Sequence, residues 1–156
     1  MLTSAKPYAR LIYQLNKSLE NSPSQIIARI NFGIGIYYEN IGSVLGTEYV
    51  YSHYQTIYKN LLDKYPDNLE FKNGLAISYG KLGYKFEVAG DSEKAILNYN
   101  IANSFFKDLN ENMPKNLDYK QGLAISYLKL GGVYLKLKDY EKAVIHFNED
   151  FKIKKE

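Results

Sequence analysis

The chain has 156 residues, 46% hydrophobic and 24% charged, which is the balance of a folded, soluble protein. Its formal charge of +3 comes from 20 basic and 17 acidic residues spread along the sequence, so no basic block indicates nucleic acid or an anionic membrane as a partner. There is no apolar run of the roughly 18 to 20 residues that cross a bilayer, and no secretory signal, so we expect a cytoplasmic location. The absence of cysteine excludes disulfides, thiolate metal sites and cysteine nucleophiles.

A repeat with an offset of 48 residues organises the sequence. The segment NLEFKNGLAISY at 68–79 returns as NLDYKQGLAISY at 116–127, and the match continues through the motifs Lys-Leu-Gly and Asp-x-Glu-Lys-Ala. A more divergent copy precedes these two. We therefore predict one domain made of a partial repeat at 1–19, a degenerate repeat at 20–67, and repeats at 68–115 and 116–156, the last slightly truncated.

Each repeat is predicted to contain two α-helices, in chain order. The segment 8–19 is amphipathic and matches the second helix of an earlier pair. In the repeat at 68–115, apolar residues recur at spacings of three and four, first at Leu69, Ala76, Tyr79, Leu82 and Phe86, then at Ala95, Tyr99, Ala102 and Phe106. Asp91 separates the two stretches, and Asp139 does so in the next repeat. Each is well placed to cap the following helix.

The same letters resemble the tetratricopeptide repeat, whose pattern is Trp-x2-Leu-Gly-x2-Tyr followed by Ala-x3-Phe. The last repeat matches with Tyr127, Leu130, Gly131, Tyr134, Ala143 and Phe147, and the one before it with Tyr79, Leu82, Gly83, Phe86, Ala95 and Tyr99. The degenerate repeat keeps Gly35 but departs at Asn31 and Thr47. The resemblance implies an all-α fold, an α–α superhelix (solenoid) of antiparallel helix pairs with about three and a half repeats. Its motif residues are expected to be core.

The repeat is longer than that of the family, which has 34 residues. The extra 14 residues of the 48-residue repeat amount to about four helical turns, or about two in each helix. Long-repeat arrays of this kind are similar to those of large bacterial signalling and defence proteins. This resemblance implies binding rather than chemistry.

Groups that could carry catalysis do not converge in the sequence. His53 and His146 each lack a second ligand at the helical spacing that a metal needs, so we expect no metal and no other cofactor. The acidic residues that recur at helix starts are explained by capping and the helix dipole. We predict that the chain is not an enzyme.

The resemblance implies that the first helices of successive repeats line a concave groove for a protein or peptide partner. The outward positions on these helices are Phe32, Ile36, Glu39, Gly80, Tyr84, Glu87, Leu128, Gly132 and Lys136. The family's grip on a C-terminal carboxylate uses Lys and Asn at positions held here by residues such as Gly80 and Tyr84, so that clamp is missing. The mixed, partly apolar surface favours an apolar helix or loop of a partner, in a non-catalytic scaffold.

The last helix suggests an alternative role in self-association. Val144, Phe147 and Phe151 follow one another at helical spacing, and stacked repeats normally end on a polar face. Two copies could meet end to end as a homodimer through these residues, or the chain could be a sensor segment of a larger bacterial signalling or defence protein. The sequence leaves both alternatives open.

Overall fold

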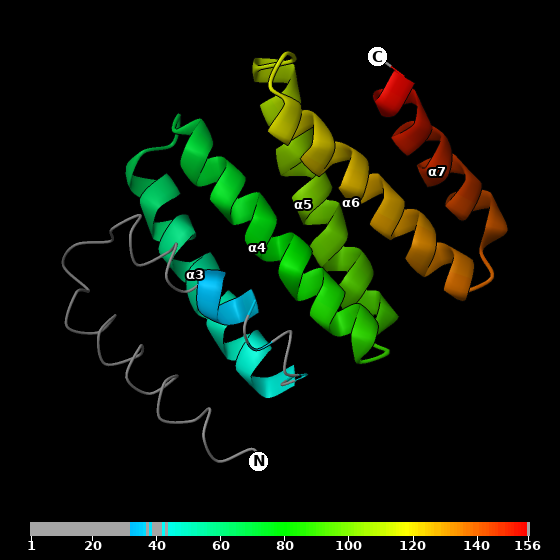
Figure 1. The fold of residues 1–156 in the computed structure, drawn as a ribbon, viewed down its shortest axis with the longest axis horizontal. Helices are drawn as coiled ribbons and strands as arrows, with labels where there is room; N and C mark the ends of the chain where they lie inside the picture. Colours follow the sequence, from blue (N-terminus) through cyan, green and yellow to red (C-terminus); the bar gives the residue numbers. More distant parts are fainter. Residues whose placement is uncertain (1–31, 37, 39–41, 43, 156) are drawn as a thin grey trace. The chain divides into compact units, whose positions relative to one another are not determined.

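The computed structural model of the chain describes residues 32–36, 38, 42 and 44–155, and all regular structure in these ranges is helical. The helices with defined bounds are α3 (Val44–Lys64), α4 (Leu69–Val88), α5 (Ser92–Asn112), α6 (Leu117–Lys136) and α7 (Tyr140–Lys155), shown in Figure 1. The chain divides into two compact units between Asp67 and Asn68, at the predicted boundary between repeats. No helix in the described ranges is long and apolar enough to cross a membrane.

The first unit is built around tyrosines of α3. Tyr51, Tyr54 and Tyr58 are all buried, and they lie at intervals of three and four residues, so they share one face of the helix. The ring of Phe32 packs against two of them, with centroid distances of 6.4 Å to Tyr51 and 5.7 Å to Tyr54. Burial, and then the neighbouring Tyr58, raise the pKa of the Tyr54 hydroxyl far above its ordinary value. The described part of this core is therefore largely aromatic.

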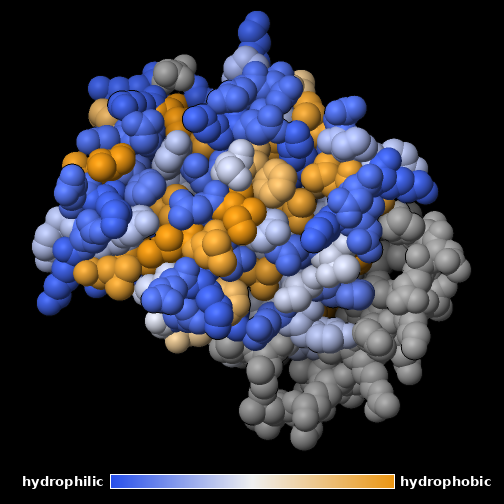
Figure 2. Space-filling view, turned by 180° about the vertical axis from the view of Figure 1, so that it is seen from behind, coloured by the Kyte–Doolittle hydropathy of each residue, from blue (hydrophilic) through white to orange (hydrophobic). Residues whose placement is uncertain are grey.

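The second unit contains two antiparallel helix pairs, α4 with α5 and α6 with α7. Helix α5 also packs against α6, and the buried residues of this unit join α4, α5 and α6 into clusters that include Ala76, Phe106 and Leu123. The helices α4 and α5 are 20 and 21 residues long, as the 48-residue repeat leads us to expect. Figure 2 shows hydrophobic side chains in patches among hydrophilic ones on the side opposite to the view of Figure 1.

One contact between paired helices occurs three times at the 48-residue offset. A Cβ added at Gly35 would collide with the ring of Tyr51, one at Gly83 would lie 2.7 Å from ring carbons of Tyr99, and one at Gly131 would lie 2.6 Å from the ring of Phe147. In each pair the glycine lets the aromatic ring of the second helix rest against the backbone of the first. Thus the degenerate repeat keeps the packing of the other two at this point.

The turns within the helix pairs are also copies of each other. The α4–α5 turn places Gly90 at φ 80°, and the α6–α7 turn places Lys138 at φ 62°. In both turns the next residue donates its backbone amide back to the helix, Asp91 to Phe86 O at 2.9 Å and Asp139 to Tyr134 O at 3.0 Å. This is the pattern of a left-handed helix cap, for which glycine is the best residue.

The predicted helix caps are present in the second unit. The Asp91 carboxylate accepts a hydrogen bond from the Lys94 amide at 3.1 Å, and the Asp139 carboxylate accepts one from the Lys142 amide at 3.2 Å. The side chain of Asn116 caps α6 in the same way. Because these bonds satisfy amides that have no partner inside the helix, they fix where each helix begins.

Candidate functional site

A groove in the second unit runs between α4 and α6, with α5 as its floor. Its volume is about 810 Å³, within the roughly 300 to 1,000 Å³ of sites that hold a drug-sized ligand. Figure 1 shows α5 between α4 and α6. The residues that line the groove are Asn73, Ile77, Gly80, Lys81, Tyr84, Tyr99, Ala102, Phe106, Asp118, Gln121, Gly122, Ile125, Ser126 and Lys129.

The floor of the groove is apolar and tightly packed. It consists of Tyr99, Ala102 and Phe106 from α5, all of which are buried. Phe106 lies directly against Gly122 of α6, where an added Cβ would collide with its ring. Because this floor is part of the core, it cannot move without disturbing the packing of the helices. A ligand would therefore meet a preformed surface.

The walls expose large apolar side chains to solvent. Tyr84 on α4 is 42% exposed and Ile125 on α6 is 46% exposed. The two walls meet at a cation–π contact, in which the Lys129 ammonium lies 4.7 Å from the centroid of the Tyr84 ring. The Tyr84 ring is thus held in place from across the groove.

The polar residues of the groove are mainly basic and neutral. Lys81 and Lys129 stand at the same position in successive repeats, and the amide side chains of Asn73 and Gln121 do so too. Asp118 is the acidic residue among the lining side chains. Two ammonium groups against one carboxylate make the groove favourable for an acidic ligand.

Beyond the groove, Glu87 is engaged within the protein. Its carboxylate accepts a hydrogen bond from the Lys136 ammonium at 2.5 Å and another from the Tyr99 hydroxyl at 2.7 Å. Burial by itself raises the pKa of Glu87, but these two hydrogen bonds and the charge of Lys129 outweigh it, so the pKa lies below its ordinary value. Burial, and then the bond to Glu87, raise the pKa of Tyr99 far above its usual range. Glu87 is therefore ionised and paired, and Tyr99 stays neutral.

The structure places the predicted partner-binding residues of the second unit in different surroundings. Gly80 and Tyr84 line the groove, whereas Leu128 and Gly132 lie on α6 outside the lining, with Leu128 43% exposed. Glu87 and Lys136 join α4 to α6 through their ion pair. Of these six residues, Gly80 and Tyr84 are the ones that line the groove.

The predicted residues of the first unit are also divided. Phe32 packs against the tyrosines of α3, and Ile36 is 37% exposed. Glu39 lies outside the described residues. Contact of Phe32 and Ile36 with a partner stays a prediction.

The sequence prediction missed the α6 side of the groove because most of the positions it chose on the first helices do not recur in the lining. Gly80 and Tyr84 of α4 line the groove, but their repeat equivalents Leu128 and Gly132 do not. The positions that line it from both helices are those of Ile77 and Lys81 in α4, which recur as Ile125 and Lys129 in α6. This recurrence of Ile and Lys was the available signal.

The histidines do not form a site in the described part of the chain. There, no three His, Asp or Glu side chains come close enough together to hold a metal ion. The His146 ring stacks on the Tyr134 ring, with centroids 5.3 Å apart and planes at 3°. Burial lowers the pKa of His146, and the charge of Glu149 opposes this only in part, so the neutral imidazole is favoured.

Similarity to known proteins is found among solved structures. No family model matches the sequence, and no curated protein matches it. The crystal structure of BtubC (BKLC) from P. vanneervenii is similar, with a TM-score of 0.71 and 16% identity over 96% of this chain. The chain spans 56% of the length of that structure. At this identity the similarity shows the all-helical fold, with helices packed in antiparallel pairs, and nothing about activity or partners.

Proposed function

We propose that the chain is a non-catalytic binding protein, and that the groove between α4 and α6 holds a short apolar segment of a partner protein that also carries carboxylates. The observation that carries the proposal is the groove itself, a preformed space of about 810 Å³ in which Tyr84 and Ile125 remain open to solvent. Exposed aromatic and aliphatic side chains above a rigid floor are typical of a peptide-binding site.

The charge of the groove supports an acidic partner. Ile77 and Lys81 of α4 recur as Ile125 and Lys129 of α6, so a bound segment would meet the same pair of side chains twice. An aliphatic contact beside an ammonium group suits an apolar residue next to Asp or Glu. We expect the preferred segment to contain this combination in two copies.

We further propose that the helix pairs form a solenoid similar to tetratricopeptide arrays. The repeated contact between a glycine and an aromatic ring, at Gly83 with Tyr99 and at Gly131 with Phe147, supports this proposal, because the same contact recurs in successive helix pairs at the 48-residue offset. The repeated turns at Gly90 and Lys138 support it as well.

Selection from a random peptide library on the full chain tests the proposal. We expect enrichment of sequences that combine aromatic or aliphatic residues with Asp or Glu. Binding of the selected peptides, measured by fluorescence anisotropy, should weaken by about 30-fold or more in Ile125→Glu, because central interface contacts contribute about 2 kcal/mol or more. Lys129→Glu should shift the preference from acidic to basic peptides.

Leu128→Glu is the matched control for Ile125→Glu. Both side chains are on α6 and similarly exposed, 43% for Leu128 and 46% for Ile125, but only Ile125 lines the groove. The control should bind the selected peptides like the unmodified chain. Equal losses in the two variants, or no enrichment of any peptide class, would show that this groove is not the binding site.

A further inference from the structure

One side of α7 has a counterpart on α5 in the same unit. We call Val144, Phe147 and Phe151 the outer face of α7. At the 48-residue offset they correspond to Ile96, Tyr99 and Asn103 of α5.

On α5 this side is covered by the next helix. Ile96 packs against a buried cluster that includes Leu130 and Val133 of α6, and Tyr99 in that cluster is only 2% exposed. The Asn103 amide donates a hydrogen bond to the Ser126 hydroxyl of α6 at 2.8 Å. The side therefore serves as a contact surface for a neighbouring helix.

On α7 the same side is open among the described residues. Val144 is 56% exposed and Phe151 is 57% exposed. The Phe147 ring rests partly buried against Gly131, so it is only in part available to a partner. The outer face thus has apolar side chains at positions that correspond to the helix-packing side of α5, and among the described residues no helix covers Val144 and Phe151.

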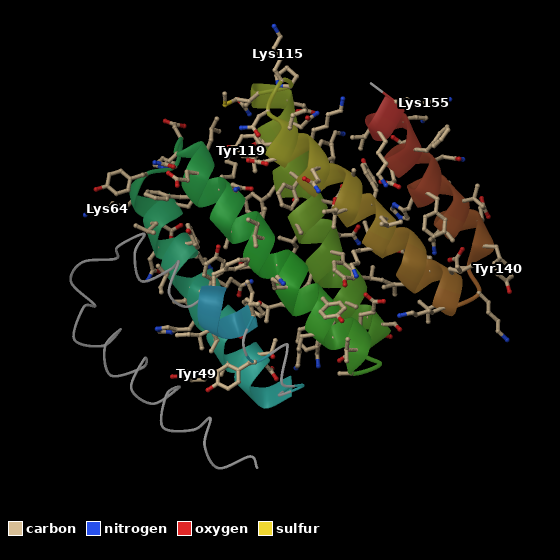
Figure 3. The ribbon with its side chains drawn as sticks, viewed as in Figure 1. Tyr49, Lys64, Lys115, Tyr119, Tyr140 and Lys155 are labelled. Carbon is tan, nitrogen blue, oxygen red and sulfur yellow. The ribbon has the colours of Figure 1, made fainter. Side chains whose placement is uncertain are left out.

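The charges of α7 indicate which helix fits there. Its first turn carries Glu141, and its last turn carries Lys152, Lys154 and Lys155. Lys152 and Lys154 are paired within the helix, to Glu149 at 2.5 Å and to Asp150 at 2.7 Å, whereas the Lys155 ammonium lies 4.4 Å from the centroid of the Phe151 ring. Figure 3 shows Tyr140 and Lys155 at opposite ends of α7. If a second copy of α7 packed antiparallel to the first, the acidic first turn of each helix would lie beside the basic last turn of the other.

We propose that two copies of the chain associate through their α7 helices, packed antiparallel, with Val144 of one copy against Phe151 of the other. Glu141 of each copy then lies near Lys155 of the other, and the helix dipoles oppose each other favourably. A helix of 16 residues is about 24 Å long, so the contact is small and belongs to the weak, transient class of interfaces, with dissociation constants of about 1 to 100 μM.

Sedimentation of the full chain over a series of concentrations tests this association. The chain should pass from monomer to dimer within that range, and Val144→Glu or Phe151→Glu should weaken the dimer at least tenfold. Ile145→Glu is the matched control, because Ile145 is 54% exposed and its α5 counterpart Leu97 is 58% exposed, so this position lies outside the contact on both helices. The control should associate like the unmodified chain.

A charge exchange tests the antiparallel arrangement separately. Glu141→Lys should weaken the dimer, and the double variant Glu141→Lys with Lys155→Glu should restore it, because the favourable pairs are then re-formed with opposite sign. A chain that stays monomeric above 100 μM, or an equal loss in Ile145→Glu, overturns the proposal. Binding of a synthetic peptide of residues 117–136, the α6 sequence, to the outer face of a monomeric chain also overturns the proposal. The outer face would then take a helix similar to α6 and not a second α7. None of these results bears on the groove, which shares no residue with the outer face.

Discussion

Replacing Gly83 by alanine should destabilise the second unit, whereas replacing Gly80 should stabilise it. Both residues are in α4, one turn apart. A Cβ at Gly83 would lie 2.7 Å from carbons of the Tyr99 ring, and one at Gly80 would meet nothing within 4 Å. Alanine gains about 1 kcal/mol over glycine in a helix at either position. The difference between the variants therefore isolates the packing contribution of Gly83.

The free-energy cost of a methyl group at position 83 depends on whether the Tyr99 ring can move away from it. The Tyr99 ring is 2% exposed, and its hydroxyl donates a hydrogen bond to Glu87 at 2.7 Å. The ring therefore cannot turn into solvent without losing its burial and this hydrogen bond. Overpacking of this kind costs about 1 to 3 kcal/mol, so Gly83→Ala should be less stable than Gly80→Ala by that amount. Urea denaturation followed by circular dichroism gives the two free energies of unfolding. Equal values would refute the close packing of α4 and α5 at Gly83.

Three further predictions concern the turns, the pH dependence of stability and hydrogen exchange in α7. Lys138→Gly should raise the free energy of unfolding by about 1 kcal/mol, because Lys138 has a left-handed φ of 62°; Gly90→Ala, at φ 80°, should lower it by a similar amount in the same denaturation assay. Burial lowers the folded-state pKa of His146, so its contribution to stability is complete above the unfolded value of about 6.5 and is lost as the pH falls below it. Melting temperatures from pH 8 to 5 should therefore fall less in His146→Gln, and an unchanged slope would contradict this. Hydrogen exchange should be faster in α7 than in α5, because α5 packs against both α4 and α6 whereas α7 packs mainly against α6, and equal protection would argue against it.

The helices and their caps were predicted well from the sequence, because they depend on interactions between residues close together in the chain, and these residues recur in each repeat. The spacing of apolar residues predicts each helix, and Asp91 and Asp139 cap helices as expected, because capping needs only a side chain and an amide three residues away. The glycine positions of the repeat motif, such as Gly83 and Gly131, were likewise predicted to admit the paired helix, and the distances to Tyr99 and Phe147 confirm this.

The candidate site was predicted only in part, because it depends on how helices lie beside one another. Of the predicted positions on α4, Gly80 and Tyr84 line the groove, and their contact with a partner stays a prediction. The α6 wall of the groove was not predicted. Ile125 and Lys129 recur from positions 77 and 81 of α4, but which of the recurring positions face the groove depends on how the helices pack. The bond from Lys136 to Glu87 joins positions 49 residues apart, which no helical periodicity within one segment reveals. Pairings between helices thus need the structure.

The packing of the repeat explains why it produces both a groove and an open outer face. Each pair is fixed where a glycine of the first helix receives an aromatic ring of the second, as at Gly83 with Tyr99, so the residues on the far side of the first helix stay out of the core. They then line the space between successive first helices, which is where Ile125 stands. Of the second helices, α5 is covered by α6, whereas on α7 residues such as Val144 are exposed in the described part of the chain. Because Ile125 and Val144 are both left outside the core by this packing, substitutions there change binding or association without changing the fold, and each surface can be tested without disturbing the other.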